Sequence, residues 1–231
     1  MTLVDYEVLI VGAGFAGSEA AFALARRGVG VGLVTTSLDS VYLPFTPIAP
    51  PFPQGSLLAE VGEAGLAGWE LHSRAKYRLE HQPHLHLIQS SVTGLILRDG
   101  AAVGVETWEG PRKTASRVVL APGSFLAPKL YIGKVAEDAG RLSEVAYPDL
   151  HECLKELGFA FESHSAEVPA QAGAPGYRVE YQVFAGGEWD ASSFRLGRLE
   201  RLYALGLCVR GGTYAEMALE GLRLAETLAN T

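Results

Sequence analysis

The stretch YEVLIVGAGFAGSEAAFALARRGVGVGLVTT, residues 6–36, predicts the start of a nucleotide-binding α/β fold. Residues 6–11 are an apolar run rich in β-branched side chains, as in buried parallel strands. An Ala- and Leu-rich stretch follows and ends at Gly28, a residue typical of the position just after a helix. A second apolar run, residues 29–36, completes a βαβ unit, which predicts a parallel sheet.

Three glycines between the first strand and the helix, Gly12, Gly14 and Gly17, have the G-x-G-x-x-G spacing of a dinucleotide-binding loop. In such a loop the first glycine allows a tight turn, the second lets a pyrophosphate approach, and the third lets the helix pack on the strand. The N-terminus of the helix then offers N–H groups to the phosphates. We therefore expect dinucleotide contacts from Gly12, Ala13, Gly14, Phe15, Ala16 and Gly17. A tight turn without a ligand is the alternative interpretation.

The second strand ends in Thr35 and Thr36, where an acidic residue usually binds the ribose of NAD. No arginine follows in TTSLDS to accommodate the extra phosphate of NADP. A threonine hydroxyl or a backbone group can replace the acid, so we expect both residues to hold a ribose. Two threonines also suit the plain end of a strand.

The rest of the chain continues the α/β pattern. Residues 40–56 hold five of the 12 prolines and predict an extended loop, and residues 57–82 predict a helix. Residues 84–123 alternate as in a β-meander with turns at RDG and EGPR. Further along we expect a short amphipathic helix within 143–158, an irregular stretch over 160–200, and a strand, a glycine turn and a helix over 202–230.

Two later glycine turns repeat the strand–glycine order. SRVVLAPG predicts a buried strand that returns to the nucleotide at Ala121, Pro122 and Gly123. LCVRGGTYAEM predicts a turn into a second helix N-terminus, where N–H groups of Gly212 and Thr213 could face a flavin. From this turn we expect cofactor contacts by Arg210, Gly211, Gly212, Thr213 and Met217. Tyr42, Phe45 and Phe52 in the proline-rich loop could cover a ring, although local packing is the usual role of such aromatics.

This order of elements is typical of FAD-dependent folds. We predict an α/β, Rossmann-like FAD-binding fold with a central parallel sheet, an inserted antiparallel β-meander, and a small irregular segment before the C-terminal strand and helix. The predicted organisation is one FAD-binding domain over 1–231. Residues 1–142 and 200–231 form its nucleotide-binding core, and 143–199 form a reduced insertion or cap.

The composition of the chain indicates which ligands and which cellular environment are expected. A net charge of −7 makes the chain a poor stand-alone binder of tRNA or other nucleic acid. Two cysteines without metal-type spacing, Cys153 and Cys208, indicate a reducing, cytoplasmic environment and no metal site. No signal peptide and no apolar run of membrane-spanning length is recognisable.

Several motifs resemble the glucose-inhibited division protein A family (GidA, also called MnmG), whose members are FAD-dependent enzymes that modify the wobble uridine of tRNA. The motifs are VLIVGAGFAGSEAAFALARRG, SRAKYRLEHQPHLHLIQSSVTGLI, GVETWEGPRKTASRVVLAPGSFLAPKLYIG and GLCVRGGTYAEMALEGLRLAETLA. The resemblance implies FAD as cofactor, held at the glycine loop, Thr35, Val92, Gly123 and the Gly211–Gly212 turn. By the same resemblance Ser91 and Arg74, which matches an arginine of the family's helix, are candidate FAD contacts.

The chain departs from the family in two respects. Its 40–56 loop lacks the family's cysteine, and 231 residues leave no room for the family's large insertion and C-terminal helical domain, which serve tRNA and partner binding. We therefore expect a truncated relative, a cytoplasmic flavoprotein oxidoreductase with no assigned catalytic residue. NADH is a candidate electron donor, and a protein partner or a homodimer fits this interpretation.

Two alternatives stay open at the level of sequence. The first is a non-catalytic FAD-binding subunit that supplies FAD to a separate tRNA-binding chain. The second is an NAD(P)H-binding reductase without a flavin. Copurification with RNA or a second protein favours the first, and NADH binding without a flavin favours the second.

Overall fold

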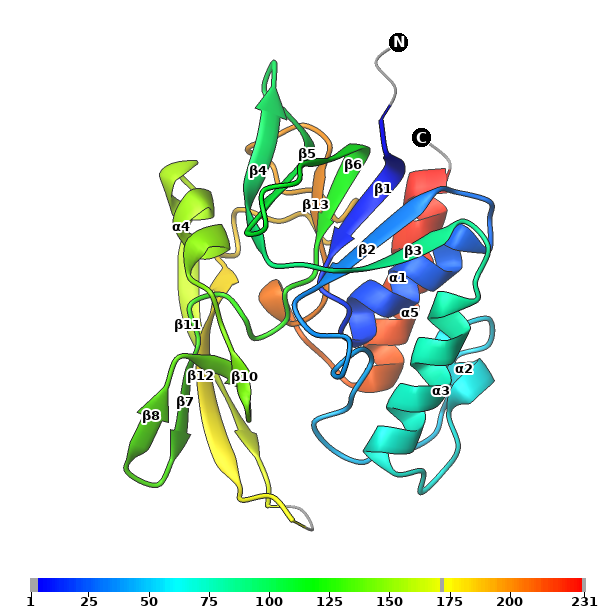
Figure 1. Ribbon diagram of the computed structural model, residues 1–231, viewed down its shortest axis with the longest axis vertical. Helices are drawn as coiled ribbons and strands as arrows, with labels where there is room; N and C mark the ends of the chain where they lie inside the picture. The colour runs from blue at the N-terminus through cyan, green and yellow to red at the C-terminus, as the bar shows by residue number, and fades with distance from the viewer. Residues whose placement is uncertain (1–3, 171–172, 230–231) are drawn as a thin grey trace.

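The structure is a computed structural model that describes residues 4–170 and 173–229 (Figure 1). A central sheet and its helices form one part, and a smaller second sheet packs beside it. The parallel strands of the central sheet are β3 (Leu85–Gln89), β2 (Val31–Thr35), β1 (Tyr6–Val11), β6 (Lys113–Leu120) and β13 (Leu202–Ala204), in that spatial order.

The meander continues the same sheet. β4 (Val92–Arg98) pairs antiparallel with β5 (Ala101–Thr107), which pairs antiparallel with the first residues of β6. The rest of β6 pairs parallel with β1, Ile10 lying opposite Val119. β6 therefore belongs to both the meander and the parallel sheet, and it carries the chain back to the carboxyl end of β1.

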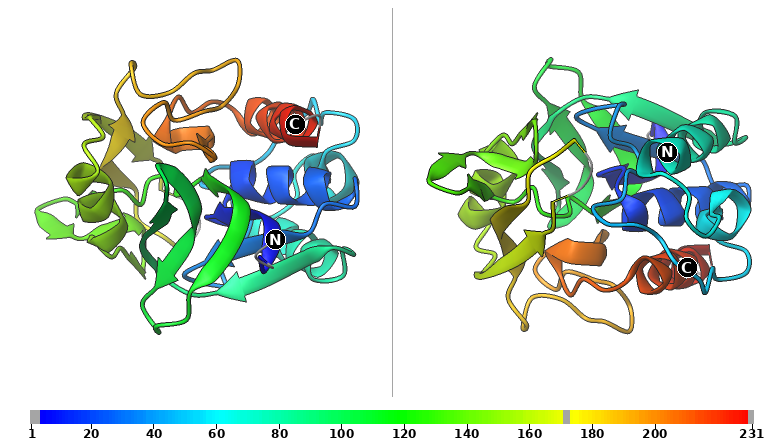
Figure 2. Two further views of the ribbon diagram at one scale, coloured as in Figure 1. Left: turned by 90° about the horizontal axis from the view of Figure 1, so that it is seen from above. Right: turned by 90° about the horizontal axis from the view of Figure 1, so that it is seen from below.

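Helices cover one face of the parallel strands. α1 (Phe15–Ala25) and α5 (Tyr214–Ala229) lie side by side on this face in both views of Figure 2. α2 (Leu57–Val61) and α3 (Gly68–Glu80) follow the proline-rich loop. Alternate residues of β1 divide between two cores. Val8 and Ile10 pack with α1 and α5, whereas Leu9 and Val11 pack with the meander and α4 (Asp149–Glu156).

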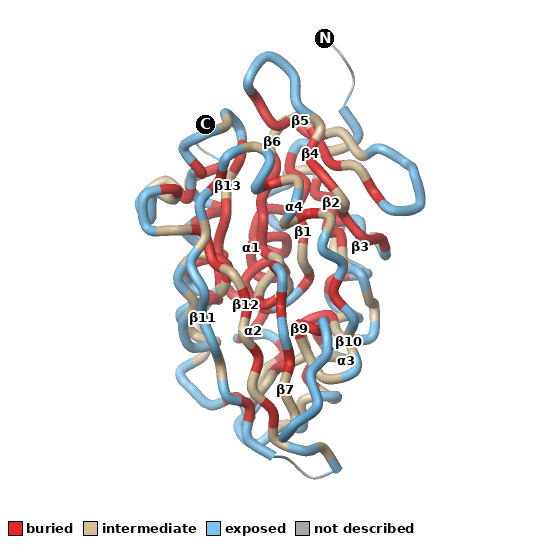
Figure 3. The backbone as a smooth tube through the Cα atoms, turned by 90° about the vertical axis from the view of Figure 1, so that its left-hand side faces the viewer, coloured by how far each residue is buried: buried red, intermediate tan, exposed pale blue. Residues whose placement is uncertain are grey.

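The second sheet has the order β11-β12-β7-β8 and lies at the lower left of Figure 1. Its long hairpin joins β11 (Phe161–Val168) and β12 (Tyr177–Phe184), and β12 pairs antiparallel with β7 (Lys129–Ile132). β8 (Val135–Glu137) is its edge strand, and β9 (Ala139–Arg141) forms a small ribbon with β10 (Glu144–Val145). In Figure 3 β11 is largely exposed and β12 is more buried.

The predicted α/β fold with a central parallel sheet is confirmed, and three local expectations are corrected. Residues 57–82 form two helices because Gly62 and the turn after it interrupt the helix. Residues 85–89 form a parallel strand outside the meander. The stretch 160–200, expected to be irregular, contains two regular strands, β11 and β12, paired in register, whereas residues 185–200 form only isolated bridges. None of the helices that the structure describes is long and apolar enough to cross a membrane.

The contact between α1 and α5 predicts the cost of adding one methyl group. A Cβ at Gly221 would lie 2.6 Å from the Glu19 Cβ and 2.7 Å from the Ala20 nitrogen. We expect Gly221→Ala to lower the free energy of unfolding by about 2 kcal/mol, because overpacking outweighs the better helix propensity of alanine. Urea denaturation measures this. Leu219→Ala, at a half-exposed position of the same helix, is the control and should change stability by less than about 1 kcal/mol.

Candidate functional site

A pocket, here called the main pocket, opens at the carboxyl ends of β1, β2 and β6. Its floor is the turn from β1 into α1, and its sides come from the start of β4, the proline-rich loop, the β9–β10 ribbon and the segment before α5. The predicted residues that line it are Gly12, Ala13, Gly14, Phe15, Ala16, Thr35, Thr36, Ser91, Val92, Ala121, Pro122, Gly123 and Met217. Carboxyl ends of parallel strands are where ligands bind in open α/β sheets.

Two glycines of the loop are required by the packing of the chain on itself. A Cβ at Gly12, whose φ is +107°, would lie 2.1 Å from the Ala121 carbonyl oxygen. A Cβ at Gly17 would lie 2.0 Å from the Gly12 carbonyl oxygen. Gly17 therefore serves the approach of helix to strand and does not line the main pocket. Both close approaches bring the ends of β1 and β6 together at the start of α1.

Gly14 differs from these two glycines. It is the N-cap of α1 with φ −70° and ψ −171°, a conformation open to any residue, and a Cβ there would meet no atom within 4 Å. No described side chain caps α1, and no acidic residue lies in its first turn. By contrast, Ser56 caps α2, accepting a hydrogen bond from the Ala59 nitrogen. The first turn of α1 thus presents N–H groups and a positive dipole end to the main pocket.

The threonine pair lies at the rim of the main pocket with Ser90 and Ser91. The Thr35 hydroxyl donates to the Ser37 carbonyl at 3.1 Å, so its oxygen keeps an acceptor position. The Thr36 carbonyl accepts from the Gln89 side chain at 3.4 Å. The pair therefore combines a structural role at the strand end with an acceptor that a hydroxyl of a ligand can reach.

The glycine turn before α5 is arranged differently from the prediction. The Thr213 nitrogen and hydroxyl both donate to the Glu216 carboxylate, at 2.7 and 2.9 Å, and the Glu216 nitrogen donates to the Thr213 hydroxyl. This reciprocal capping box occupies the Thr213 N–H that we expected to face a flavin. Hydrogen bonding to Thr213 also holds the pKa of Glu216 below its usual value. Gly212 and Thr213 line a neighbouring side pocket, not the main pocket.

Three further candidates lie outside both pockets. Arg210 pairs with the buried Glu220 at 2.7 Å, and the Gly211 nitrogen donates to the Gly206 carbonyl, so both stabilise the turn. Arg74 lies on the exposed face of α3 and pairs with Glu70 at 2.7 Å. Hydrogen bonding to Glu70 raises the pKa of Arg74. The position of Arg74 is that of a solvated helix face.

An aromatic column fastens the proline-rich loop to the two helices. The Phe15 ring stacks on Tyr42 with centroids 3.9 Å apart, and on its other side it meets Tyr214 at 4.3 Å. The Tyr214 hydroxyl accepts hydrogen bonds from the nitrogens of Phe45 and Thr46, at 2.8 and 2.9 Å. Tyr42 is therefore a buried anchor of the loop, whereas Phe45 and Tyr214 reach both pockets.

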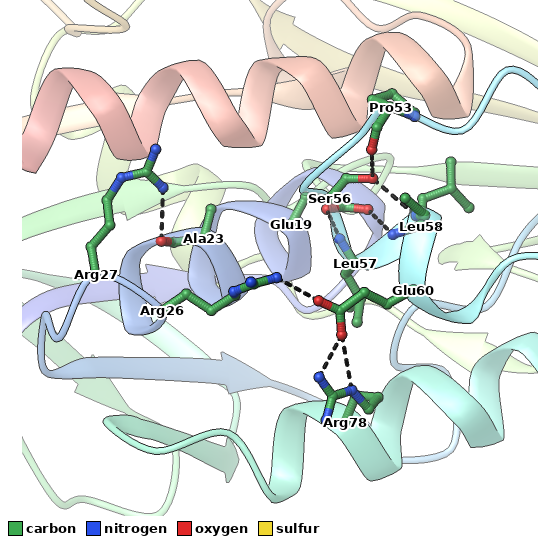
Figure 4. A network of polar contacts seen from close by, with 11 residues as sticks. Glu19, Ala23, Arg26, Arg27, Pro53, Ser56, Leu57, Leu58, Glu60 and Arg78 are labelled. Carbon is green, nitrogen blue, oxygen red and sulfur yellow. Dashed lines mark hydrogen bonds and ion pairs between the residues drawn. The ribbon is translucent and has the colours of Figure 1, made fainter.

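The buried carboxylate of Glu19 holds the other end of the same loop (Figure 4). It accepts hydrogen bonds from the backbone nitrogens of Leu57 and Leu58, both at 2.8 Å, and from the Tyr42 hydroxyl. Desolvation by burial raises the pKa of Glu19 above its usual value, against the hydrogen bonds that lower it. A single acid in α1 thus fixes both the start and the end of the loop.

Several residues that line the main pocket lie outside the motifs recognised in the sequence, and Arg141 makes the most contacts among those described below. Its guanidinium donates to the carbonyls of Leu43 and Pro44, each at 2.6 Å, and lies 4.5 Å from the Phe45 ring centroid. It lines the main pocket with Glu144 and Tyr147 from the same region. The short strands β9 and β10 carry no motif, so no local signal marks these residues.

The remaining polar candidates show no metal site. Among the described residues no group of three or more His, Cys, Asp or Glu side chains could hold a metal ion. Both cysteines are free thiols, and burial raises the pKa of Cys208 to about 12. Cys208 lies in the short 3-10 helix Gly206–Cys208, not in the predicted strand.

The Glu19 anchor predicts a large effect on stability. Glutamine in its place lacks the charge, and its NH2 group must face the backbone nitrogen of either Leu57 or Leu58, which donate to different oxygens of Glu19. We expect Glu19→Gln to lower the free energy of unfolding by about 2–4 kcal/mol. The control is Glu60→Gln, which removes only exposed ion pairs to Arg26 and Arg78 and should cost less than about 1 kcal/mol. Equal losses in the two variants would contradict the anchor.

The raised pKa of Glu19 adds a pH dependence with a definite sign. The folded state holds this proton more tightly than the unfolded state, whose pKa is near 4.5. The stabilising contribution of the protonated form is complete below that pH and is lost as the pH rises through the raised value. We expect the stability difference between the native protein and Glu19→Gln to shrink as urea titrations move upward from pH 4. A difference that grows with pH would contradict the direction of the shift.

Comparisons with known proteins agree with this fold. A family model described as glucose inhibited division protein A matches residues 7–65 and 62–171. The tRNA uridine 5-carboxymethylaminomethyl modification enzyme MnmG of Lactiplantibacillus plantarum is 31% identical over 211 residues, which cover 78% of this chain and 33% of that protein. Its counterpart in Alkaliphilus oremlandii is 32% identical over 199 residues, covering 72% and 32%. The chain spans about a third of the length of these relatives.

Solved structures extend the likeness over nearly the whole chain. The GidA-related protein from Thermus thermophilus is similar with a TM-score of 0.93 and 55% identity, covering 97% of this chain and 98% of that one. Aquifex aeolicus GidA gives a TM-score of 0.85 at 15% identity, covering 99% and 64%, and shows the shared fold. On the family model and these relatives, the chain belongs to the glucose inhibited division protein A family.

Proposed function

We propose that this protein is an FAD-dependent oxidoreductase. The observation that carries the proposal is the uncapped N-terminus of α1, with Gly14 open toward a pocket at the carboxyl ends of the parallel strands. A pyrophosphate suits this position, because its charge is stabilised by the helix dipole and by N–H groups that no described side chain caps. In this proposal residues 1–142 and 200–231 form the nucleotide-binding core, and 143–199 form the cap.

The lining of the main pocket fits the other parts of FAD. Thr35, Thr36, Ser91 and Val92 would hold the adenosine, since they gather at the end of β2 and the start of β4. The opposite part of the lining, with Phe45, Tyr214 and Met217, is apolar and aromatic and suits a flavin ring. Ala121, Pro122 and Gly123 lie between these regions on the turn after β6. When bound, FAD supplies hydride and electron transfer.

The residues of the chain would position the cofactor and tune its surroundings. The column of Tyr42, Phe15 and Tyr214 fixes the proline-rich loop against the pocket and excludes water from that side. Because Thr213 is engaged with Glu216, the α5 turn offers less charge stabilisation than a free helix N-terminus would. We assign no catalytic acid or base.

The proposal does not extend to tRNA modification by this chain alone. The relatives named as tRNA modification enzymes are about three times as long as the matched region, and the net charge here is −7. A chain with that charge lacks the general attraction for phosphates that tRNA binding needs. A redox reaction on a small molecule, or delivery of a reduced flavin to a partner, is therefore the function that we propose to test.

The direct test is the absorption spectrum of the purified protein, repeated after NADH is added without oxygen. Flavin bands, present on isolation or after addition of FAD, are the expected result. Bleaching by NADH would identify a working reductase, and a bound flavin that NADH leaves oxidised would indicate another donor or a carrier. A colourless protein that takes up no FAD would overturn the proposal, and NADH binding in that protein would favour the flavin-free reductase.

Gly14 supplies a sharper prediction. Gly14→Val keeps an allowed backbone conformation, its Cβ meets no protein atom within 4 Å, and its side chain fills the space proposed for the pyrophosphate. We expect an unchanged melting temperature of the FAD-free protein and at least about tenfold weaker FAD binding, measured by fluorescence titration. Gly197→Val is the matched control, because Gly197 is an exposed glycine that also faces open space. FAD binding unchanged in Gly14→Val would contradict the placement.

A further inference from the structure

A second cavity, the side pocket, adjoins the main pocket. It lies between the proline-rich loop, the β11–β12 hairpin and the start of α5, and its volume is about 480 Å³. This is the usual size of a small-molecule site and too small for a macromolecule. Both pockets are lined by Phe45, Ser124, Leu207, Tyr214 and Met217. A ligand in the side pocket would therefore lie against the end of the main pocket assigned above to the flavin ring.

The lining of the side pocket disfavours an anion. No lysine or arginine is among the described residues that line it, and its single carboxylate is the exposed Glu167. Most of the surface is apolar, with Pro47, Pro50 and Pro51 on one side and Val168 and Val179 on the other. A phosphate or carboxylate placed here would lose water without gaining an opposite charge. The occupant that fits is uncharged.

The hydroxyl groups of the side pocket are nearly all engaged. The Ser124 hydroxyl donates to the Gly140 carbonyl at 2.8 Å, and the Thr213 hydroxyl donates to Glu216 at 2.9 Å. The Tyr214 hydroxyl accepts from two backbone nitrogens of the loop. These groups hold the walls together and leave little capacity for a ligand.

Tyr181 is the exception. The alternation of β12 places Tyr181 and Val179 on its buried face, and both line the side pocket. The Tyr181 side chain is only 6% exposed, and its hydroxyl has no hydrogen-bond partner among the described residues. This hydroxyl is not among the fully buried polar atoms that lack a partner, so it keeps access to water, and a ligand can replace that water. Burial also raises the pKa of Tyr181, so the group stays a protonated donor at neutral pH.

We propose that the side pocket binds an uncharged, flat carbonyl compound whose oxygen accepts a hydrogen bond from Tyr181. The apolar walls and the Phe45 and Tyr214 rings suit a conjugated ring system, and the Tyr181 hydroxyl suits a carbonyl oxygen as its donor. That this compound is the substrate rests on the proposed function, because only FAD in the main pocket would make the side pocket a reaction site. The cavity itself is formed by the chain alone.

Two probes with the same rings test the charge preference. 2-Naphthamide is uncharged, and 2-naphthoate carries a carboxylate in place of the amide. We expect calorimetric titration to give at least about tenfold tighter binding of 2-naphthamide. Equal affinities, or tighter binding of 2-naphthoate, would overturn the proposal, as would the absence of binding by both probes.

Variants locate the binding. Tyr181→Phe keeps the ring and removes the donor, so we expect 2-naphthamide to bind about three- to tenfold more weakly. The control is Tyr131→Phe on β7, whose hydroxyl bonds Glu180 and which lines neither pocket. Glu167→Lys should strengthen binding of 2-naphthoate severalfold and leave 2-naphthamide unchanged. Identical effects of Tyr181→Phe and Tyr131→Phe would reject Tyr181 as the donor.

Titrations with and without FAD separate this inference from the proposed function. Binding of 2-naphthamide by a protein that takes up no FAD would keep the side pocket and reject the flavin. FAD uptake without 2-naphthamide binding would reject the side pocket alone. In the FAD-loaded protein we expect 2-naphthamide to shift the visible flavin bands, because the two pockets share residues. Bound 2-naphthamide with unshifted bands would overturn its assignment to the substrate position.

Discussion

Where β1, β6 and α1 meet, two glycines leave no room for a side chain. Gly12 lies so near the Ala121 carbonyl, and Gly17 so near the Gly12 carbonyl, that a Cβ at either would fall about 2 Å from a backbone oxygen. These contacts at Gly12 and Gly17 hold two strand ends and a helix start together. The middle glycine of the loop, Gly14, is therefore not needed for this packing. A Cβ at Gly14 would contact no other part of the protein, and Gly14 lines the main pocket. The same loop thus separates glycines needed for the fold from a glycine left for a ligand.

A second constraint shapes the remaining walls. The proline-rich loop has few hydrogen bonds within itself, such as that from the Leu43 nitrogen to the Ser40 carbonyl, and its position depends on groups from other elements. Glu19 holds both of its ends, Tyr214 binds its backbone nitrogens, and Arg141 binds its carbonyls. A buried acid is costly unless every acceptor site is used, which explains why Glu19 has three donors. The loop in turn forms part of the wall of the main pocket and one side of the side pocket.

The parts of the site that could be predicted from sequence are those encoded locally. The glycine spacing, the strand end at Thr35 and the turn at Gly123 follow from short motifs, and all contribute to the main pocket or its packing. Arg210 and Arg74 pair with Glu220 and Glu70 and lie outside both pockets, which a sequence does not show because it does not reveal the acid that a cation contacts. The β11–β12 hairpin and Arg141 were missed because their positions depend on pairing across distant segments. The position of Tyr181 at the side pocket depends on the alternation along β12 and on where that strand packs, which the sequence does not show.

A crystal structure of the protein, from crystals grown with FAD, tests the proposed position of the cofactor most directly. We predict the pyrophosphate at the N-terminus of α1 beside Gly14, the adenosine at Thr35 and Val92, and the flavin ring beside Phe45, Tyr214 and Met217, with the side pocket open next to the ring. A pyrophosphate bound anywhere other than the first turn of α1, or a main pocket that excludes FAD at saturating concentration, would contradict the account.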